Sequence, residues 1–445
     1  MTLYADTPRT DPDLHPSDEV TPIAEAPAFA FDVAIVGLGY VGLPTAISYH
    51  AGGNRVLGVD VSTRRLATIH RGEADLLPRD QDRLSAALAG DDLQLTADAS
   101  RLSEAAAVVI CVPTPVDEHL VPDLSLLASA CRTVVEHAVP GQTLMLTSTT
   151  YVGCTQDFLV APLRERGLRA GSDVFVAFSA ERIDPGNDAF DQALVPRVVG
   201  GATARCRAAA VGLLRRYALE VHEVGSLAAA EMTKLLENTF RAVNIALANE
   251  FADICDHLGI EVNDVIDAAS TKPYGFMAFR PGPGVGGHCI PCDPHYLLWQ
   301  LKRDRVDAPL IERTMTEIAQ RPGRIVEQAK ERLAQNGGSL RRAKVLVVGV
   351  SYKPDVADLR ESPALEILQR LEQGGAKVGY LDSHFPSLRL PAGTELTGVE
   401  DPASFHPDLV LIHTRHRDVD LSWVTPDQTV LDTRYPSRSV SEAVA

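Results

Sequence analysis

The sequence predicts an α/β protein with two doubly wound domains, joined by a long central helix and a helical middle domain. Patterns of buried strands alternate with helix patterns at both ends of the 445-residue chain. This alternation is typical of parallel sheets covered by helices. Between the two ends, apolar residues recur every three or four positions from about residue 227 to 258, uninterrupted by proline or glycine. That spacing predicts one continuous helix.

Composition excludes several classes of function. The net charge of −17 argues against nucleic acid or an anionic membrane as the main partner. No apolar run reaches membrane-spanning length. Seven cysteines, several in apolar runs such as the one around Cys111, indicate reduced thiols in a cytoplasmic protein. Residues 1–30 are acidic and proline-rich, lack the features of a secretory signal, and are expected to form a flexible tail.

The first domain opens on a glycine-rich turn. The run 31–36 reads as a buried strand, Gly37, Gly39 and Gly42 form G-x-G-x-x-G, and a helix pattern follows. Gly37 permits a tight turn, Gly39 lets a pyrophosphate approach the helix N-terminus, and Gly42 lets helix and strand pack closely. The next strand ends at Asp60, which would accept hydrogen bonds from a ribose diol and repel a 2′-phosphate. This context predicts a Rossmann-like NAD site.

Other strand ends supply further candidate cofactor contacts. The segment Cys111–Pro115 follows one strand and Thr147–Thr150 follows another, and ligands bind at such ends in parallel sheets. A simple exit from the sheet and a helix-capping cluster remain alternatives for these segments. Arg64 and Arg65 lie near Asp60 and weaken the preference for NAD over NADP. The expected cofactor-binding set is Gly37, Gly39, Tyr40, Val41, Gly42, Asp60, Arg65, Pro113, Thr114 and Thr149.

The central helix carries one apolar stripe. A helix of this length is expected to serve as a spine between domains or between subunits. The stripe consists of Met232, Leu236, Phe240, Val243, Leu247, Phe251, Ile254 and Leu258.

The stretch from Arg280 to Gln300 concentrates reactive side chains in a loop ahead of an apolar run. Cys289 and Cys292 form C-x-x-C, flanked by His288, Asp293 and His295. A zinc site, a dithiol redox pair, a single nucleophilic cysteine and a structural loop are the alternatives. No second C-x-x-C or H-x-x-x-H completes a zinc site, and a redox pair normally follows a strand directly. The sequence therefore favours a nucleophilic cysteine without excluding the others.

The residues after the cysteines predict how this thiol would be activated. Asp293 reads as a helix N-cap and Pro294 as the first helical residue. Cys289 would then precede a helix N-terminus, whose positive potential is expected to lower the pKa of its thiol. A thiolate beside a nicotinamide can capture an aldehyde as a thiohemiacetal. A second oxidation gives a thioester, and water releases an acid, so that an alcohol becomes a carboxylate at the expense of two NAD.

Four long motifs together resemble the nucleoside-diphosphate-sugar 6-dehydrogenase family. They are VGLGYVGLP, KLLENTFRAVNIALANE, PGPGVGGHCIPCDP and SYKPDVADLRESPALEI, in family order, and the resemblance covers nearly the whole chain after the tail. It implies two Rossmann-like domains, a homodimer or higher homo-oligomer formed by the central helix, and NAD-dependent oxidation of a nucleotide-sugar C6 hydroxyl to a uronic acid. The expected boundaries are tail 1–30, NAD domain 31–223, helical dimerisation domain 224–322 and nucleotide-sugar domain 323–445.

The resemblance also implies roles for individual residues. Cys289 matches the catalytic thiol, and Lys234 would stabilise developing oxyanions. Asn238 would hold water or a substrate oxygen, and Asp293 would position the lysine and the water. Glu181 would be a general base if burial raised its pKa.

Further matches concern water and substrate. Thr149 would share in the water network, and Lys353 and Arg360 would supply positive charge for a diphosphate. No metal is expected. The implied substrate-binding set is Glu181, Arg182, Lys234, Asn238, Arg280, Gly286, Lys353 and Arg360.

Departures from the family pattern bear on specificity. Ala180 stands where proline is frequent, and Cys292 stands where lysine or another residue is frequent, which leaves metal capture or oxidation open. The segment ERIDPGN resembles the N-acetylhexosamine branch more than the EFLREG type, which favours UDP-N-acetylglucosamine. UDP-glucose, TDP-glucose and UDP-N-acetylmannosamine are the alternative substrates. A nucleotide-sugar binder that has lost catalysis and a zinc alcohol dehydrogenase are the alternative functions.

Overall fold

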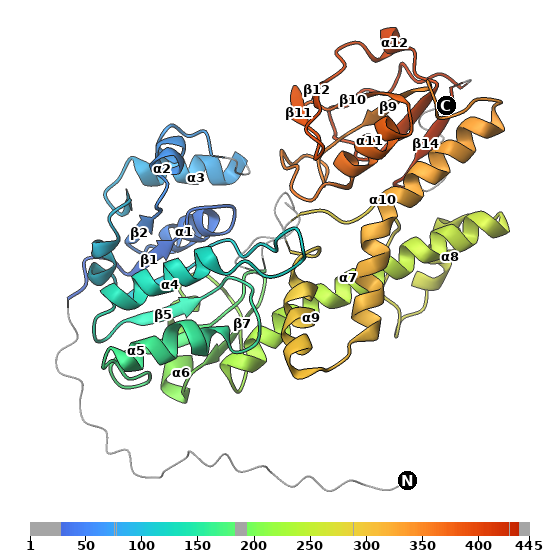
Figure 1. The fold of residues 1–445 in the computed structure, drawn as a ribbon. Coiled ribbons are helices and arrows are strands. Elements are labelled where there is room, and N and C mark those ends of the chain that lie inside the picture. The colour runs from blue at the N-terminus through green and yellow to red at the C-terminus, as the bar shows by residue number, and fades with distance from the viewer. Residues whose placement is uncertain are drawn as a thin grey trace, which may run out of the picture.

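The computed structural model describes residues 28–74, 76, 78–182, 194–287, 289–426 and 428–435. Most of the predicted tail, residues 1–27, and His288 of the reactive loop therefore lie outside the described residues. Figure 1 shows two α/β domains, with the long helix α7 leading away from the first domain and α10 packed against α7 on the side of the last domain.

The described strands are β1 (Val33–Val36), β2 (Val56–Val59), β3 (Leu93–Thr96), β4 (Ala107–Ile110), β5 (Thr143–Leu146), β6 (Phe175–Phe178), β7 (Arg197–Gly201), β8 (Val221–Glu223), β9 (Lys344–Val348), β10 (Lys377–Leu381), β11 (Ser387–Arg389), β12 (Glu395–Thr397), β13 (Leu409–Ile412) and β14 (Val430–Asp432). The described helices are α1 (Gly42–Ala51), α2 (Thr63–His70), α3 (Pro78–Leu88), the 3-10 helix η1 (Ala99–Glu104), α4 (Ser125–His137), the π-helical turn η2 (Gln156–Val160), α5 (Ala161–Glu165), α6 (Ala204–Leu214), α7 (Leu227–Leu258), α8 (Val262–Ser270), α9 (Asp293–Asp304), α10 (Pro309–Gln335), α11 (Pro363–Gln373) and α12 (Pro402–Phe405).

The first domain is a doubly wound sheet of the predicted class. Its strand order is β3-β2-β1-β4-β5-β6-β7-β8, and every pair is parallel except β6 with β7. One apolar cluster packs α1, α2, α3 and α6 against one face, and a second packs α4, η2 and α5 against the other. The chain order reverses between β1 and β4, which is where ligands bind in such sheets.

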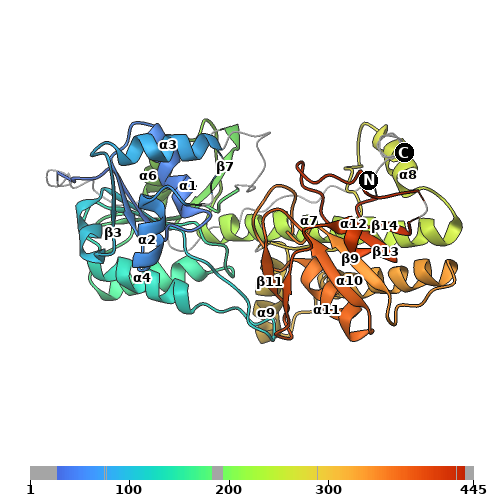
Figure 2. The same ribbon diagram turned by 90° about the horizontal axis from the view of Figure 1, so that it is seen from above.

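Helix α7 begins and ends where the sequence predicts. The Ser226 hydroxyl accepts a hydrogen bond from the Ala229 N–H, and the chain leaves the helix at Gly259 with a left-handed φ of 69°. Figure 2 shows α7 extending from the first domain beneath the last one. Its buried face is made of small and polar residues such as Asn238, Ala242 and Ala252.

The apolar stripe of α7 lies on the opposite, exposed face. Its members other than the half-buried Val243 are 41 to 65% exposed: Met232, Leu236, Phe240, Leu247, Phe251, Ile254 and Leu258. Within one chain, the stripe therefore does not join domains. An apolar face of this extent is typical of a surface that another protein surface covers.

The last domain begins with the second half of α10, which contributes Ile325, Val326, Ala329 and Leu333 to its core. This helix runs through the boundary predicted between residues 322 and 323 and contains Pro322. The parallel sheet β10-β9-β13-β14 follows, with α11 and the second half of α10 packed on one face. Strands β11 and β12 form a separate antiparallel pair.

Two properties of the described chain bear on its surroundings. None of the described helices combines the length and apolarity needed to cross a membrane. All seven cysteines are free, and six of them are buried.

Candidate active site

The glycine-rich turn has the shape that a dinucleotide requires. Gly37 has a φ of +88°, and a Cβ on Gly42 would lie 1.8 Å from the Gly37 carbonyl oxygen, so close packing needs both glycines. A Cβ on Gly39 would meet nothing within 4 Å, which leaves room beside this backbone for a pyrophosphate. Val41 precedes α1, and no side chain caps that N-terminus. The turn therefore fits NAD.

Asp60 stands at the end of β2, beside this turn. Its carboxylate accepts hydrogen bonds from the Leu38 N–H at 2.8 Å and the Ser62 N–H at 2.8 Å. Arg65 donates from Nε to the Leu38 carbonyl at 2.8 Å, so its side chain braces the turn from α2. Asp60 is only partly buried, which leaves it accessible to a ribose.

Helix α9, which follows the cysteine loop, docks on the strand ends of the first domain. Thr114 is buried and Pro113 is exposed at the end of β4, and the Tyr296 hydroxyl of α9 donates to the Pro115 carbonyl at 3.4 Å. After β5, the half-buried Thr149 precedes Val152. Gln300 of α9 exchanges hydrogen bonds of 3.0 and 2.8 Å with the backbone of Val152.

The loop ahead of Cys289 packs on the last domain. A Cβ on Gly286 would lie 2.5 Å from the Tyr352 Cβ and 2.8 Å from the Glu361 carbonyl oxygen. The Gly287 N–H donates to the Arg360 carbonyl at 3.0 Å. The predicted role of Gly286 in substrate binding thus coincides with a close contact between this loop and the segment that carries Lys353 and Arg360.

Four predicted catalytic residues come together where α7, the loop and α9 meet. The Asn238 amide donates a hydrogen bond to the buried Asp293 carboxylate. The charge of Lys234, one turn earlier on α7, lowers the pKa of both Asp293 and the Cys289 thiol. Cys289 is the one exposed cysteine of the chain. Asn238 of α7 and Asp293 at the start of α9, 55 residues apart in the chain, therefore belong to one cluster.

The prediction that the helix N-terminus lowers the pKa of Cys289 is wrong for this arrangement. Protein packed around the sulfur removes water from the thiol, although part of the residue reaches solvent, and this desolvation raises the pKa to about 11. The negative charge of Asp293 raises it further. Lys234, Arg360 and Arg241 act in the opposite direction without prevailing. The resting residue is a protonated thiol at neutral pH.

Asp293 does not cap its own helix as predicted. It is the first residue of α9, the N-cap position belongs to Cys292, and no side chain caps the helix. Instead the Asp293 carboxylate points across to Asn238. Burial raises its pKa to about 6, while Lys234 and the Asn238 hydrogen bond oppose that rise.

Glu181 and Arg182 are engaged in ion pairs. The buried Glu181 carboxylate accepts a 2.9 Å hydrogen bond from the buried Arg197, and a 2.7 Å one from the Arg182 N–H. Arg182 pairs with Glu237 of α7. A general-base role for Glu181 would therefore require the pair with Arg197 to open.

The remaining predicted substrate contacts lie in two places. Arg280 donates a 2.7 Å hydrogen bond to the Asn263 side chain. It also forms an ion pair with Asp267 of α8, and the side chains of Arg280 and Asp267 are both half exposed. Arg360 pairs with Asp358, and its guanidinium lies 4.3 Å from the centroid of the Tyr40 ring. Lys353 is partly buried in the same segment as Arg360.

The described part of the chain contains no cluster of metal ligands. No group of three or more histidine, cysteine, aspartate or glutamate side chains is placed to hold an ion there. Cys292 is buried, and burial raises the pKa of its thiol to about 12. Burial lowers the pKa of His295, which favours the neutral ring.

Two charged residues near the site are not among the predicted site residues. Arg241 lowers the pKa of Cys289 and follows Lys234 by seven positions, so the i, i+4, i+7 spacing with Asn238 would have found it. Arg197 opens strand β7, and a charged residue ahead of the apolar run VVGG is a signal of a buried ion pair.

Three family models match the chain in order. The NAD binding domain of the UDP-glucose/GDP-mannose dehydrogenase family matches residues 31–218, its central domain matches 228–318, and its UDP binding domain matches 346–436.

Individual relatives agree with these matches. NDP-N-acetyl-D-galactosaminuronic acid dehydrogenase of Ralstonia nicotianae is 34% identical, over 90% of this chain and 95% of the relative. UDP-N-acetyl-D-glucosamine 6-dehydrogenase of Pseudomonas aeruginosa is 33% identical, over 87% and 90%. The solved UDP-N-acetylmannosamine dehydrogenase of Pyrococcus horikoshii superposes with a TM-score of 0.79 at 32% identity, covering 87% of this chain and 90% of that one. The chain therefore belongs to the UDP-glucose/GDP-mannose dehydrogenase family and is an NAD-dependent nucleotide-sugar 6-dehydrogenase.

Proposed function

We propose that the protein oxidises the C6 hydroxyl of a UDP-N-acetylhexosamine, with UDP-N-acetylglucosamine as the preferred substrate, to the uronic acid through a covalent intermediate on Cys289. The observation that carries the proposal is the cluster of Cys289, Asp293, Asn238 and Lys234. It lies on elements that dock on the strand ends of the NAD domain and on the Lys353–Arg360 segment. Bound NAD would supply the hydride acceptor for both oxidations.

Cys289 captures the aldehyde that the first oxidation leaves. A carbon–sulfur bond forms as the carbonyl π bond breaks, and the thiol proton is released. Because the resting thiol is protonated, the positive charges of Lys234 and Arg360 matter most while that proton departs. Lys234 also stabilises the oxyanion that develops on the former carbonyl oxygen.

Asp293 and Asn238 prepare the hydrolysis of the thioester. With a pKa of about 6, Asp293 is mostly a carboxylate at neutral pH and is basic enough to accept a proton from water. The Asn238 amide holds one oxygen of the Asp293 carboxylate, so the second oxygen of that group also keeps a fixed orientation. When water adds and the carbon–sulfur bond breaks, Cys289 regains its proton and the acid is released.

Lys353 and Arg360 are proposed to bind the diphosphate. A guanidinium and an ammonium together match the charge of two phosphates in a chain whose net charge is −17. Asp358 fixes the orientation of the Arg360 side chain.

The choice of sugar rests on two supports. The segment that begins with Glu181 and Arg182 has the pattern of the N-acetylhexosamine branch. The relatives are named for N-acetylated glucosamine, mannosamine and galactosaminuronic acid, all at similar identity. UDP-N-acetylmannosamine, UDP-glucose and TDP-glucose are the alternative substrates.

The α7 stripe supports a homodimer. Its exposed apolar residues run the length of the helix, and a second copy of the same face would cover them by two-fold symmetry. The proposal is that α7 packs against α7 of a second subunit.

A substrate panel tests the function. Purified protein with NAD is offered UDP-N-acetylglucosamine, UDP-N-acetylmannosamine, UDP-N-acetylgalactosamine, UDP-glucose, UDP-galactose and TDP-glucose, and NADH and acid are quantified. The expected result is two NADH per acid and the highest kcat/KM with UDP-N-acetylglucosamine. A higher kcat/KM with another sugar would replace the sugar assignment, and NADH from none of them would overturn the function.

A further inference from the structure

The first βα turns of the two α/β domains are built alike. In the NAD domain, the Gly37 N–H donates to the Val59 carbonyl at 2.8 Å, and Asp60 at the end of β2 accepts from the Leu38 N–H at 2.8 Å. The aspartate expected to bind a ribose thus also holds the turn.

The last domain repeats this arrangement residue for residue. The Gly349 N–H donates to the Leu381 carbonyl at 2.8 Å, and Asp382 at the end of β10 accepts from the Val350 N–H at 2.7 Å. Gly349 has a φ of +77°, close to that of Gly37. The domain therefore has the framework of a nucleotide-binding turn.

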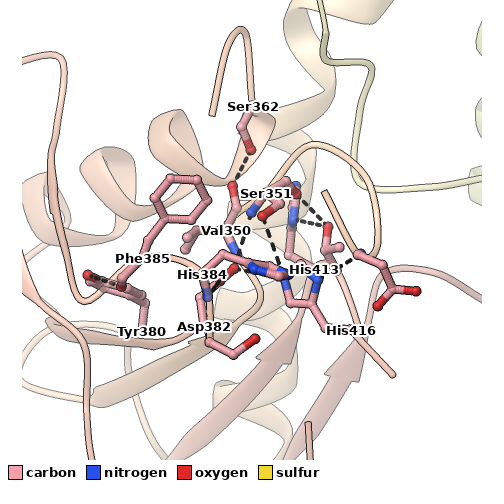
Figure 3. Close-up of polar contacts among 12 residues, drawn as sticks. Val350, Ser351, Ser362, Tyr380, Asp382, His384, Phe385, His413 and His416 are labelled. Atoms are coloured by element: carbon pink, nitrogen blue, oxygen red, sulfur yellow. Dashed lines mark hydrogen bonds and ion pairs between the residues drawn. The ribbon is translucent and has the colours of Figure 1, made fainter. Parts of the chain in front are cut away.

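A buried histidine closes this second turn. The Nε2 of His416 lies 3.0 Å from the Asp382 carboxylate, and both side chains are fully buried, whereas Asp60 is partly exposed. Figure 3 shows the ring of His416 beside Asp382 and His384. His384 packs edge-on against it with ring centroids 4.6 Å apart. The position next to Asp382 is filled by protein, and no ribose can take it.

The other ring nitrogen of His416 holds the segment that precedes Arg360. Its Nδ1 accepts a 2.9 Å hydrogen bond from the Asp355 N–H, which places the ring proton on Nε2, facing Asp382. Asp355 has a left-handed φ of 59°, a conformation that a non-glycine residue keeps only when its surroundings hold it. The Arg417 N–H donates to the Asp355 carboxylate at 2.9 Å. Asp355 lies between Lys353 and Arg360.

We propose that His416 is a positioning residue for the nucleotide-sugar site: by bridging Asp382 and Asp355, it fixes the 352–360 segment in the conformation that presents Lys353 and Arg360. This inference rests on the proposed function, since it takes those two residues as substrate contacts. Asp382 is a firm anchor because its hydrogen bonds outweigh burial and lower its pKa to about 2. The bridge is therefore charged on the Asp382 side throughout the working pH range.

Two amide variants separate the two halves of the bridge. The side-chain amide of asparagine reaches the position of Nδ1 and can accept from Asp355, whereas the amide of glutamine reaches the position of Nε2 and can donate to Asp382. His416→Asn therefore keeps the bond to the substrate segment, and His416→Gln loses it. Tyr380→Phe is the control, because it removes another hydrogen bond of β10, the partly buried one from the Tyr380 hydroxyl to the Phe385 carbonyl at 2.9 Å.

The experiment measures UDP binding by calorimetry, KM for the best sugar of the panel, KM for NAD, and the melting temperature. We expect His416→Gln to weaken UDP binding and raise the sugar KM by about tenfold, with kcat and the NAD KM little changed. In His416→Asn and Tyr380→Phe, the UDP affinity and the sugar KM should stay within about threefold of the wild-type values. The melting temperatures of all three variants should fall by comparable amounts.

Two results would overturn the inference. One is unchanged UDP affinity in His416→Gln. The other is an equal loss in all three variants, which would mean that general destabilisation of the domain is the cause. A wild type that neither binds UDP nor oxidises any sugar of the panel would instead overturn the proposed function, and the inference with it.

Discussion

The guanidinium of Arg360 lies over the ring of Tyr40, at 4.3 Å from its centroid. Tyr40 belongs to the glycine-rich turn of the NAD domain, and Arg360 belongs to the segment proposed to bind the diphosphate. The contact joins the glycine-rich turn directly to the segment proposed to bind the diphosphate. A ligand that orders one partner therefore lowers the cost of ordering the other.

Removing the Tyr40 ring should uncouple the two sites. The coupling factor is the ratio of the UDP affinity with NAD to the UDP affinity without it. A partly exposed cation–π contact contributes about 0.5–1 kcal/mol, so we expect the coupling factor of Tyr40→Ala to be roughly two- to fivefold smaller than that of the wild type. Tyr40→Phe keeps the ring and should retain the coupling. Calorimetric titration of UDP with and without NAD measures it, and equal coupling factors in the wild type and Tyr40→Ala would contradict the role.

The two cysteines should differ sharply in function. Cys289→Ser should abolish acid formation, because an alcohol captures and releases the acyl group far less readily than a thiol, while NAD binding persists. Cys292→Ser should retain most activity, since the buried Cys292 faces no reacting atom in the proposal. Loss of all activity in Cys292→Ser, with the fold intact by circular dichroism, would favour the metal or dithiol alternative.

Lys234→Ala should slow the chemistry rather than weaken binding. Loss of one preorganised group that stabilises an oxyanion typically costs about 10²–10³ in kcat. Lys302→Ala, on the exposed last turn of α9, serves as the control and should leave kcat unchanged. Steady-state kinetics would disprove the assignment if only KM rose in Lys234→Ala.

Asp293 should make stability depend on pH in a defined direction. Its pKa is raised to about 6 in the folded chain, so the folded state holds the proton more tightly than the unfolded state. Stability from this group is therefore present below about pH 4 and is lost as the pH rises through about 6. Between about pH 4 and pH 6, the free energy of unfolding of the wild type should fall by roughly 3 kcal/mol or less relative to that of Asp293→Asn. Urea unfolding at pH 4, 5, 6 and 7 measures it, and a constant difference between the two proteins would refute the shift.

Charge on the α7 stripe should separate subunits. Leu247→Glu combined with Phe251→Glu places two carboxylates on the proposed interface, and both positions are exposed within one chain, so the fold should survive. We expect sedimentation velocity to show a dimer for the wild type and a monomer for the variant. Leu219→Glu, at an apolar residue 77% exposed outside the stripe, should remain dimeric. A wild-type monomer at micromolar concentration would exclude the interface.

Features that depend on neighbouring residues were predictable from the sequence. The limits of α7 follow from the Ser226 cap, Gly259 and an uninterrupted apolar period, all of which act locally. The glycine-rich turn and its partner Asp60 form within one βαβ unit, so their spacing predicts their contact.

Features that depend on distant packing were not predictable. The pKa of Cys289 is set by desolvation and by Asp293, and the side chain of Asp293 is set by Asn238 on another helix rather than by its own. The pairing of Glu181 with Arg197 depends on how two strands lie in the sheet. A sequence states which groups are charged, but only the fold decides how much water each retains.

Because α7 is one unbroken helix, it fixes the spacing and the rotation between the proposed catalytic residues and the apolar stripe. Lys234 and Asn238 face one way, and the apolar stripe faces the other. Insertion of a single residue between Asn238 and Leu247 would rotate everything beyond it by about 100° and advance it by about 1.5 Å. Either the active site or the outer face would then point in the wrong direction. As related sequences diverge, insertions and deletions should therefore accumulate in the surrounding loops rather than in α7.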